Sequence, residues 1–149
     1  MSLDDWLKSN WLHVHQTSAR EIADLFAIAD RDLQTARIDG LATDWKLAIA
    51  YTAALRLATA ALAAAGYRAS REAHHYRIIQ SLAFTIGADK NIIGLLDTFR
   101  RIRNVSDYER AGTVSDRDAD EMYHLAEQLR TNILQWLRIH HKHLVADIV

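Results

Sequence analysis

The sequence of 149 residues has no cysteine and no proline, and only five glycines. Without cysteine, disulfide scaffolds, thiolate zinc sites and cysteine nucleophiles are excluded, and a cytoplasmic location is favoured. Proline normally makes up about 5% of a sequence and is the main breaker of helix interiors. Its absence favours long uninterrupted helices.

An excess of charge of either sign is also lacking, with 18 basic and 19 acidic residues and a formal net charge of −1. Nucleic-acid binding would therefore require a local basic patch. One long apolar run, residues 47–67, is long enough to span a bilayer. Because Arg56 lies near its middle, where membrane insertion costs roughly 2.5–3.5 kcal/mol, we interpret the run as a buried helix of a protein that does not enter a membrane.

Apolar residues recur at helical spacing in several segments, and four glycines (Gly40, Gly66, Gly87 and Gly112) fall where the spacing stops. The first predicted helix is short and covers residues 3–12. The longer ones begin at Ser18 with Glu21 in a capping-box pattern, at Thr43 or Asp44, at Ser70, at Asp89 or Asn91, and at Ser115 with Asp118. They end near residues 38, 65, 86, 103 and 137, with Tyr76, Ile79, Leu82 and Ala83 facing inward in the helix over 70–86.

The predicted fold class is therefore all-α, an antiparallel up-and-down bundle of four to five helices in a single domain over residues 1–149. Eight alanines between residues 53 and 65 make the helix over 43–65 the candidate centre. Eight residues are predicted to form the core: Leu55, Ala58, Leu62, Leu82, Leu96, Phe99, Leu125 and Leu129. Exposed Trp6, Trp11 and Trp136 would leave apolar surface for a partner, which predicts a homodimer.

The stretch from Arg100 to Tyr108 closes a predicted helix and begins the longest predicted connection, from Asn104 to Val114. Arginine binds phosphate through two hydrogen bonds, asparagine bonds to backbone or base edges, and tyrosine stacks on bases. The competing interpretation is structural, with the arginines paired to Asp107 or Glu109.

Two histidine clusters complete the chemically notable residues. His74 and His75 begin a predicted helix beside Arg71 and Arg77, and packing is the favoured role for both. His140, His141 and His143 follow the last helix and are interpreted as solvated, because a metal site would need more carboxylate ligands. No metal and no cofactor are predicted.

The order of these motifs resembles the HEPN domain (higher eukaryotes and prokaryotes nucleotide-binding domain) over residues 19–137. The alanine-rich helix ends near Gly66, His74-His75-Tyr76 follows, Arg103-Asn104 comes next with Tyr108, and a Ser115-capped acidic turn precedes a long last helix. The resemblance implies a four- or five-helix bundle that is commonly dimeric. Many members are toxin ribonucleases encoded beside a nucleotidyltransferase antitoxin.

The resemblance also implies a site, since the ribonuclease members carry an arginine, usually a polar residue after it, and a histidine four to six residues further on. Arg103 and Asn104 match the first half, and Tyr108 stands where the histidine is expected. Tyrosine has a pKa of about 10 and is a poor general base at neutral pH. We therefore expect a non-catalytic or weakly catalytic module that binds RNA, nucleotide or a protein partner through Arg100, Arg103, Asn104, Asp107 and Tyr108.

Two alternatives stay open. One is a metal-independent endoribonuclease toxin in which Arg103, Asn104 and Tyr108 are the catalytic candidates and His74 or His75 supplies the missing base. The other is a structural dimerisation scaffold.

Overall fold

The helices of the computed structural model confirm the all-α bundle. The structure describes residues 1–108, 114–146 and 148, with the backbone alone for residues 105–108. Its elements, in chain order, are α1 (Leu3–Lys8), β1 (Leu12–Val14), α2 (Ala19–Ala36), α3 (Thr43–Ala64), β2 (Tyr67–Ala69), α4 (His74–Ser81), α5 (Lys90–Tyr108), α6 (Asp116–His140) and the short 3-10 helix η1 (Lys142–Leu144).

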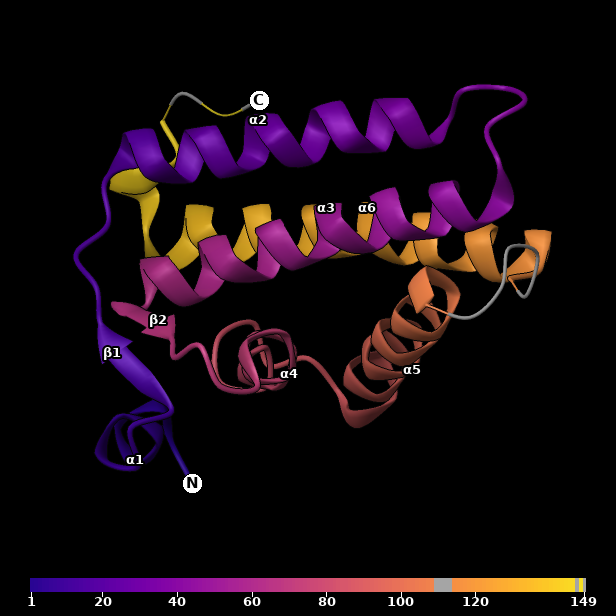
Figure 1. Cartoon of the computed structure of the whole chain (residues 1–149). Helices are drawn as coiled ribbons and strands as arrows, with labels where there is room; N and C mark the ends of the chain where they lie inside the picture. Colours follow the sequence, from indigo (N-terminus) through magenta and orange to yellow (C-terminus); the bar gives the residue numbers. More distant parts are fainter. Residues whose placement is uncertain (109–113, 147, 149) are drawn as a thin grey trace.

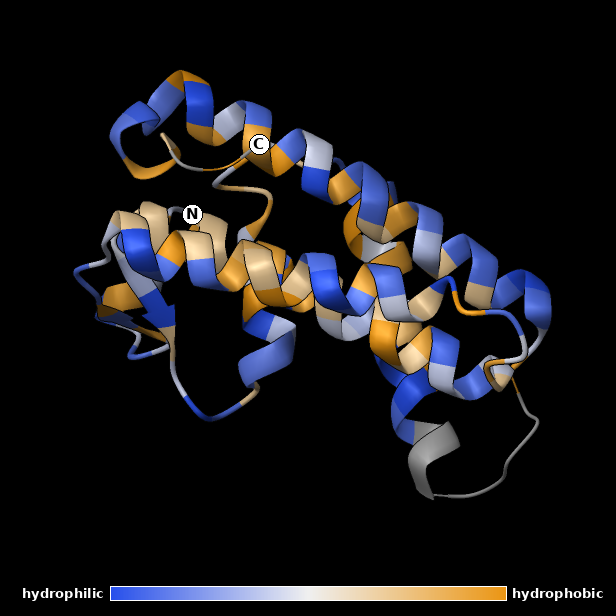
Figure 2. Ribbon diagram, turned by 90° about the horizontal axis from the view of Figure 1, so that it is seen from above, coloured by the Kyte–Doolittle hydropathy of each residue, from blue (hydrophilic) through white to orange (hydrophobic). Residues whose placement is uncertain are grey.

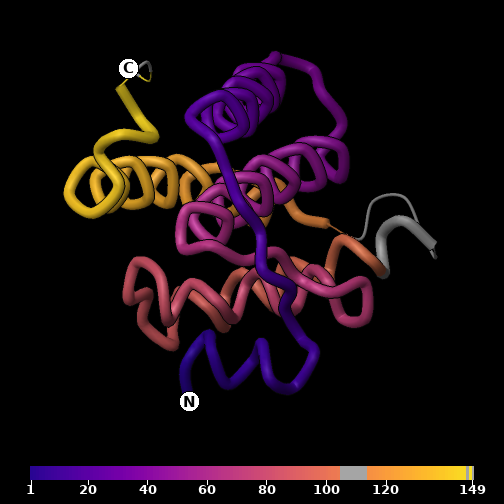
Figure 3. The backbone as a smooth tube through the Cα atoms, turned by 90° about the vertical axis from the view of Figure 1, so that its left-hand side faces the viewer, coloured from indigo at the N-terminus to yellow at the C-terminus, as the bar shows by residue number. Residues whose placement is uncertain are grey.

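The helices form layers (Figures 1 and 3). α2 lies on one side, α3 and α6 lie next to each other in the middle, and α4, α5 and α1 lie on the other side. α2 and α3 are antiparallel neighbours, whereas α6 runs beside α3 in the same direction (Figure 1). Along α2 and α6 hydrophobic and hydrophilic residues alternate with the helical repeat (Figure 2), as expected for helices that bury one face.

α3 is the centre of the bundle, as its alanines predict. Its buried residues are mostly small, and they occur on more than one face: Leu47, Ala50, Tyr51, Ala53, Ala54, Leu57, Ala58, Ala60, Ala61, Leu62 and Ala63. By length and composition α3 could also cross a membrane, but 61% of its apolar window is buried inside the protein. Small side chains allow neighbouring helices to approach closely, and α2, α6, α4 and α5 all contact α3.

Short polar side chains start most of the long helices at the predicted places. The Ser18 hydroxyl accepts the backbone N–H of Glu21 (3.1 Å), Ser115 forms a reciprocal capping box with Asp118, and Asp89 accepts the N–H of Ile92 (2.9 Å). The prediction for α3 was wrong, because Ala42 occupies its cap position and provides no side-chain acceptor.

Two polar side chains in the first turn of α3 contact the beginning of α6 instead. The Thr43 hydroxyl donates to the Asp116 carboxylate (2.6 Å), and the Lys46 ammonium group is paired with Asp120. The amino ends of α3 and α6 are therefore joined side by side.

The predicted helix over residues 3–12 is wrong in its second half. α1 ends at Lys8, Asn10 adopts a left-handed conformation (φ 62°), and Leu12 begins β1. β1 pairs antiparallel with β2, with Leu12 opposite Ala69 and Val14 opposite Tyr67. Strands of three residues are too short to show an alternating pattern, so periodicity could not predict them.

The pairing of β1 with β2 also makes two predictions wrong, the helix over residues 70–86 and the exposure of Trp6. Because β2 and a turn precede it, α4 begins only at His74 and ends at Ser81. Trp6 is 5% exposed, since its ring packs against the rings of Trp11 (5.8 Å) and Phe84 (5.2 Å). Trp11 and Trp136 are half-buried, and Trp45 is the exposed tryptophan instead.

The predicted core is confirmed at six of its eight residues, while Leu55 and Leu125 are half-buried at its edge. Tyr76 and Ala83, predicted to face inward, are exposed because α4 packs on α3 through Ile78, Ile79 and Leu82. α5 does not end at Arg103 but continues to Tyr108, so the predicted connection from Asn104 is wrong over its first residues.

A substitution in α5 tests this packing. Leu96 is 2% exposed, whereas its neighbour Leu95 is only partly buried. Truncation of a fully buried leucine leaves a cavity, so Leu96→Ala should lower the free energy of unfolding by about 2–5 kcal/mol. Leu95→Ala should cost clearly less. Urea unfolding of both variants measures this, and equal losses would mean that α5 presents a different face to the core.

Candidate functional site

Four of the predicted site residues, His74, His75, Arg100 and Asn104, line a pocket between α4 and α5, whereas Arg103 is not among its lining residues. The pocket has a volume of about 440 Å³ and is lined by Ala73, His74, His75, Tyr76, Arg100 and Asn104. The histidines and the arginine, which lie more than twenty residues apart in the sequence, thus share one site.

The α5 side of the pocket is basic because its residues follow the helical repeat. Arg100, Arg103 and Asn104 are separated by three and four residues and therefore lie on one face of α5. The Nε of Arg100 donates to Asp97 (2.8 Å), which fixes the guanidinium in place. The guanidinium carbon of Arg103 lies 5.6 Å from the centre of the Tyr51 ring, so its charge is held against α3.

The α4 side of the pocket is the amino end of that helix. Ala73 occupies the cap position in a left-handed conformation (φ 52°), and alanine has no side-chain acceptor for the first N–H groups. An uncapped helix start carries a partial positive charge that favours anions. The Nδ1 of His74 donates to the carbonyl of Ser70 (3.0 Å), which orients the imidazole ring at this end.

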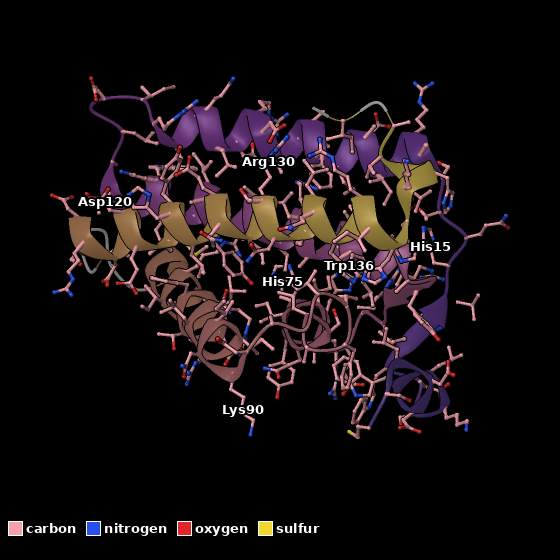
Figure 4. The ribbon with its side chains drawn as sticks, turned by 180° about the vertical axis from the view of Figure 1, so that it is seen from behind. His15, His75, Lys90, Asp120, Arg130 and Trp136 are labelled. Atoms are coloured by element: carbon pink, nitrogen blue, oxygen red, sulfur yellow. The ribbon has the colours of Figure 1, made fainter. Side chains whose placement is uncertain are left out.

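His75, which is half-buried whereas His74 is exposed, lies between α4 and the layer of α3 and α6 (Figure 4). Its Nδ1 is 3.4 Å from the Tyr51 hydroxyl on α3. Burial, and then the positive charge of Arg103, lower the pKa of His75 below its usual value. At neutral pH the ring is therefore uncharged and able to accept a proton.

Tyr51 supports the pocket from α3, and the analysis of the sequence did not single it out. Burial raises the pKa of Tyr51 to about 12, against the opposing effect of the nearby Arg103 and Arg100. The phenol is consequently neutral at all physiological pH values. The sequence does distinguish Tyr51, because it is the only aromatic residue in the alanine-rich residues 46–66.

The remaining predicted residues lie elsewhere. The side chains of Asp107 and Tyr108 are outside the described residues. His141 packs against Trp136 (4.9 Å between ring centres) at the far end of α6, and burial lowers its pKa. In the described part of the chain, no three His, Asp or Glu side chains are grouped so as to hold a metal ion.

The protonation of His75 gives a direct test of this arrangement. Its folded-state pKa lies below the value in the unfolded chain, so the unfolded chain binds more protons below about pH 6.5. Stability contributed by neutral His75 should therefore be lost as the pH falls from 7 through 6.5 towards the folded-state pKa. His75→Gln should flatten that part of the stability–pH curve from urea unfolding.

A second measurement identifies the cause. NMR titration of the imidazole, assigned by comparison with His75→Gln, should place its pKa below 6.5. Arg103→Gln should raise this pKa without restoring the usual value, because burial remains. A wild-type His75 that titrates at or above 6.5 would contradict the described environment.

No protein-family model matches the sequence, and neither a curated protein nor a solved structure matches it.

Proposed function

We propose that this chain is an HEPN-like helical module that binds the phosphate groups of RNA or of a nucleotide between α4 and α5. One observation carries the proposal: His74 and His75, at an uncapped helix start, share a pocket with Arg100 and Asn104 of the neighbouring helix. Each of these groups favours a bound anion or can donate a hydrogen bond to it.

In this proposal Arg100, Asn104 and Arg103 have different roles. Asp97 holds the Nε of Arg100, and among the described contacts the terminal nitrogens of Arg100 stay available for two parallel hydrogen bonds to a phosphate. The exposed amide of Asn104 reaches the same pocket and can bond to a sugar or a base edge. Arg103 adds positive charge from behind the pocket, where it acts on His75 and Tyr51.

The resemblance places this module in a wider proposal. The chain would act in the cytoplasm as a homodimer, with a nucleotidyltransferase antitoxin as the partner that the resemblance implies. A net charge of −1 leaves the surface without a general affinity for polyanions, so binding at one basic pocket is consistent with the composition.

Removal of the guanidinium that faces the pocket tests phosphate binding. Arg100→Gln should weaken binding of a short RNA by about tenfold or more, because a hydrogen bond to a charged group contributes about 1.5–3 kcal/mol. Arg20→Gln is the matched control, since Arg20 is almost fully exposed on α2 in the opposite layer. Fluorescence anisotropy at fixed salt measures both affinities.

The scaffold alternative gives different results in the same experiment. In that case the wild-type protein binds neither RNA nor nucleotide, and Arg100→Gln and Arg103→Ala lower the melting temperature alone. Either finding would reject the binding proposal.

A second candidate function, a metal-independent endoribonuclease, is favoured by the neutral state of His75. Cleavage of RNA through its own 2′-hydroxyl needs a base with a pKa near or below neutrality, and His75 is such a group next to Arg100 and Arg103. Residues 103–108 contain no histidine that could act as this base, so His75 would take that role.

The cleavage experiment separates binding from catalysis. Purified protein in a metal chelator should cut single-stranded RNA, and His75→Gln should reduce the rate by at least tenfold while RNA affinity changes little. Arg20→Gln again serves as the control. Intact RNA after prolonged incubation with the wild-type protein would leave binding alone as the function.

A further inference from the structure

We propose that the pocket is one end of a longer binding track for single-stranded RNA, formed by Arg100, Tyr76, Arg77 and Trp11. We call these four residues the stacking track. The inference rests on the proposed function, which it extends by adding positions for further nucleotides and a preference for unpaired bases.

The four side chains alternate between guanidinium groups and aromatic rings. The guanidinium carbon of Arg100 lies 5.7 Å from the Tyr76 ring centre, and that of Arg77 lies 5.6 Å from it on the α4 side. Arg77 then lies 3.6 Å from the ring centre of Trp11, which is close stacking. Arg100 and Tyr76 also line the pocket, so the track begins there and leads away from it towards the amino-terminal segment.

The far end of the track is held firmly. The backbone N–H of Ser70 donates to the Trp11 carbonyl (2.9 Å), and its hydroxyl donates to the carbonyl of Asn10 (2.6 Å). The Trp11 ring is supported by Trp6, and β1 pairs with β2 directly after it. A rigid aromatic group loses little conformational freedom when a base stacks on it, which favours binding.

Exposure and charge suit an RNA strand. Tyr76 is 37% exposed, and Arg77 is half-buried with its guanidinium against rings. Within the described residues Arg77 forms no ion pair, so its charge is not neutralised by a carboxylate. Arginine interleaved with aromatic side chains binds single strands, because the rings stack on bases while the cations meet phosphates. Paired bases in a duplex do not offer their faces, so duplex RNA should not use the track.

The test compares two ligands of different length, 5′-AMP and a ten-nucleotide oligoadenylate RNA. The wild-type protein should bind the oligonucleotide more tightly than 5′-AMP and more tightly than a ten-base-pair RNA duplex. Arg77→Gln should weaken oligonucleotide binding by about tenfold and leave 5′-AMP binding unchanged, because 5′-AMP occupies the pocket alone. Arg20→Gln, which removes the same charge from α2, should change neither.

Two further measurements distinguish weaker binding from a loss of folding. Arg77→Lys keeps the charge without the planar group and should give an intermediate loss of affinity. The oligonucleotide should also quench tryptophan fluorescence in the wild-type protein, and the quenching should largely disappear in Trp11→Phe.

The outcomes distinguish the two proposals. Failure of the wild-type protein to bind either ligand would reject the proposed function. Binding of both ligands with equal affinity, or an Arg77→Gln variant that loses melting temperature but binds the oligonucleotide like Arg20→Gln, would reject the track and leave phosphate binding intact. In that last case the stack of Arg77 on Trp11 only fastens the amino-terminal segment to α4.

Discussion

Close packing around the alanine-rich α3 is the constraint on which the rest of the structure depends. Small side chains on several faces of α3 allow α2 and α6 to pack directly against its backbone, and α4 and α5 to cover the opposite side. Tyr51 is the largest fully buried side chain on this helix, and its hydroxyl reaches towards α4. The position of His75 is therefore set by a residue of the central helix rather than by α4 alone.

The electrostatics of the pocket follow from that position. His75 is neutral because it is partly buried and because the positive charges of Arg103 and Arg100 lie nearby. A bound phosphate would reverse this environment, since a nearby anion favours the protonated imidazole. Binding of an anion in the pocket would therefore be thermodynamically linked to uptake of a proton by His75. Without a bound anion His75 is a neutral base, and a bound anion would shift it towards the protonated form.

Helical periodicity and capping residues were sufficient to predict α2, α6, the beginning of α5 and most of the core. They failed where residues distant in sequence decide the structure. Trp6 is buried because β1 pairs with β2, some fifty-five residues later in the chain, and brings the amino-terminal segment under α4. The three arginines between residues 100 and 103 suggested a helix end, because cations favour that place, whereas α5 continues beyond them.

The candidate site was predictable residue by residue but not as an assembly. Arg100, Asn104, His74 and His75 could each be named from the sequence, because their side-chain chemistry is apparent there. Their meeting in one pocket depends on how α4 packs beside α5, and no local pattern encodes this. The stack of Arg77 on Trp11 is equally non-local, since it needs both the strand pairing and the first turn of α4.

The parallel direction of α3 and α6 has an electrical consequence for the whole molecule. Two parallel helices add their macrodipoles and place both positive ends together, at the end where Asp44, Asp116 and Asp118 lie in the first turns. These carboxylates offset the helix ends locally, and Arg138 does the same for the last turn of α6. Lys46 and Arg117 lie among these carboxylates, so the charges of the side chains and of the two helix ends partly cancel at this end of the bundle.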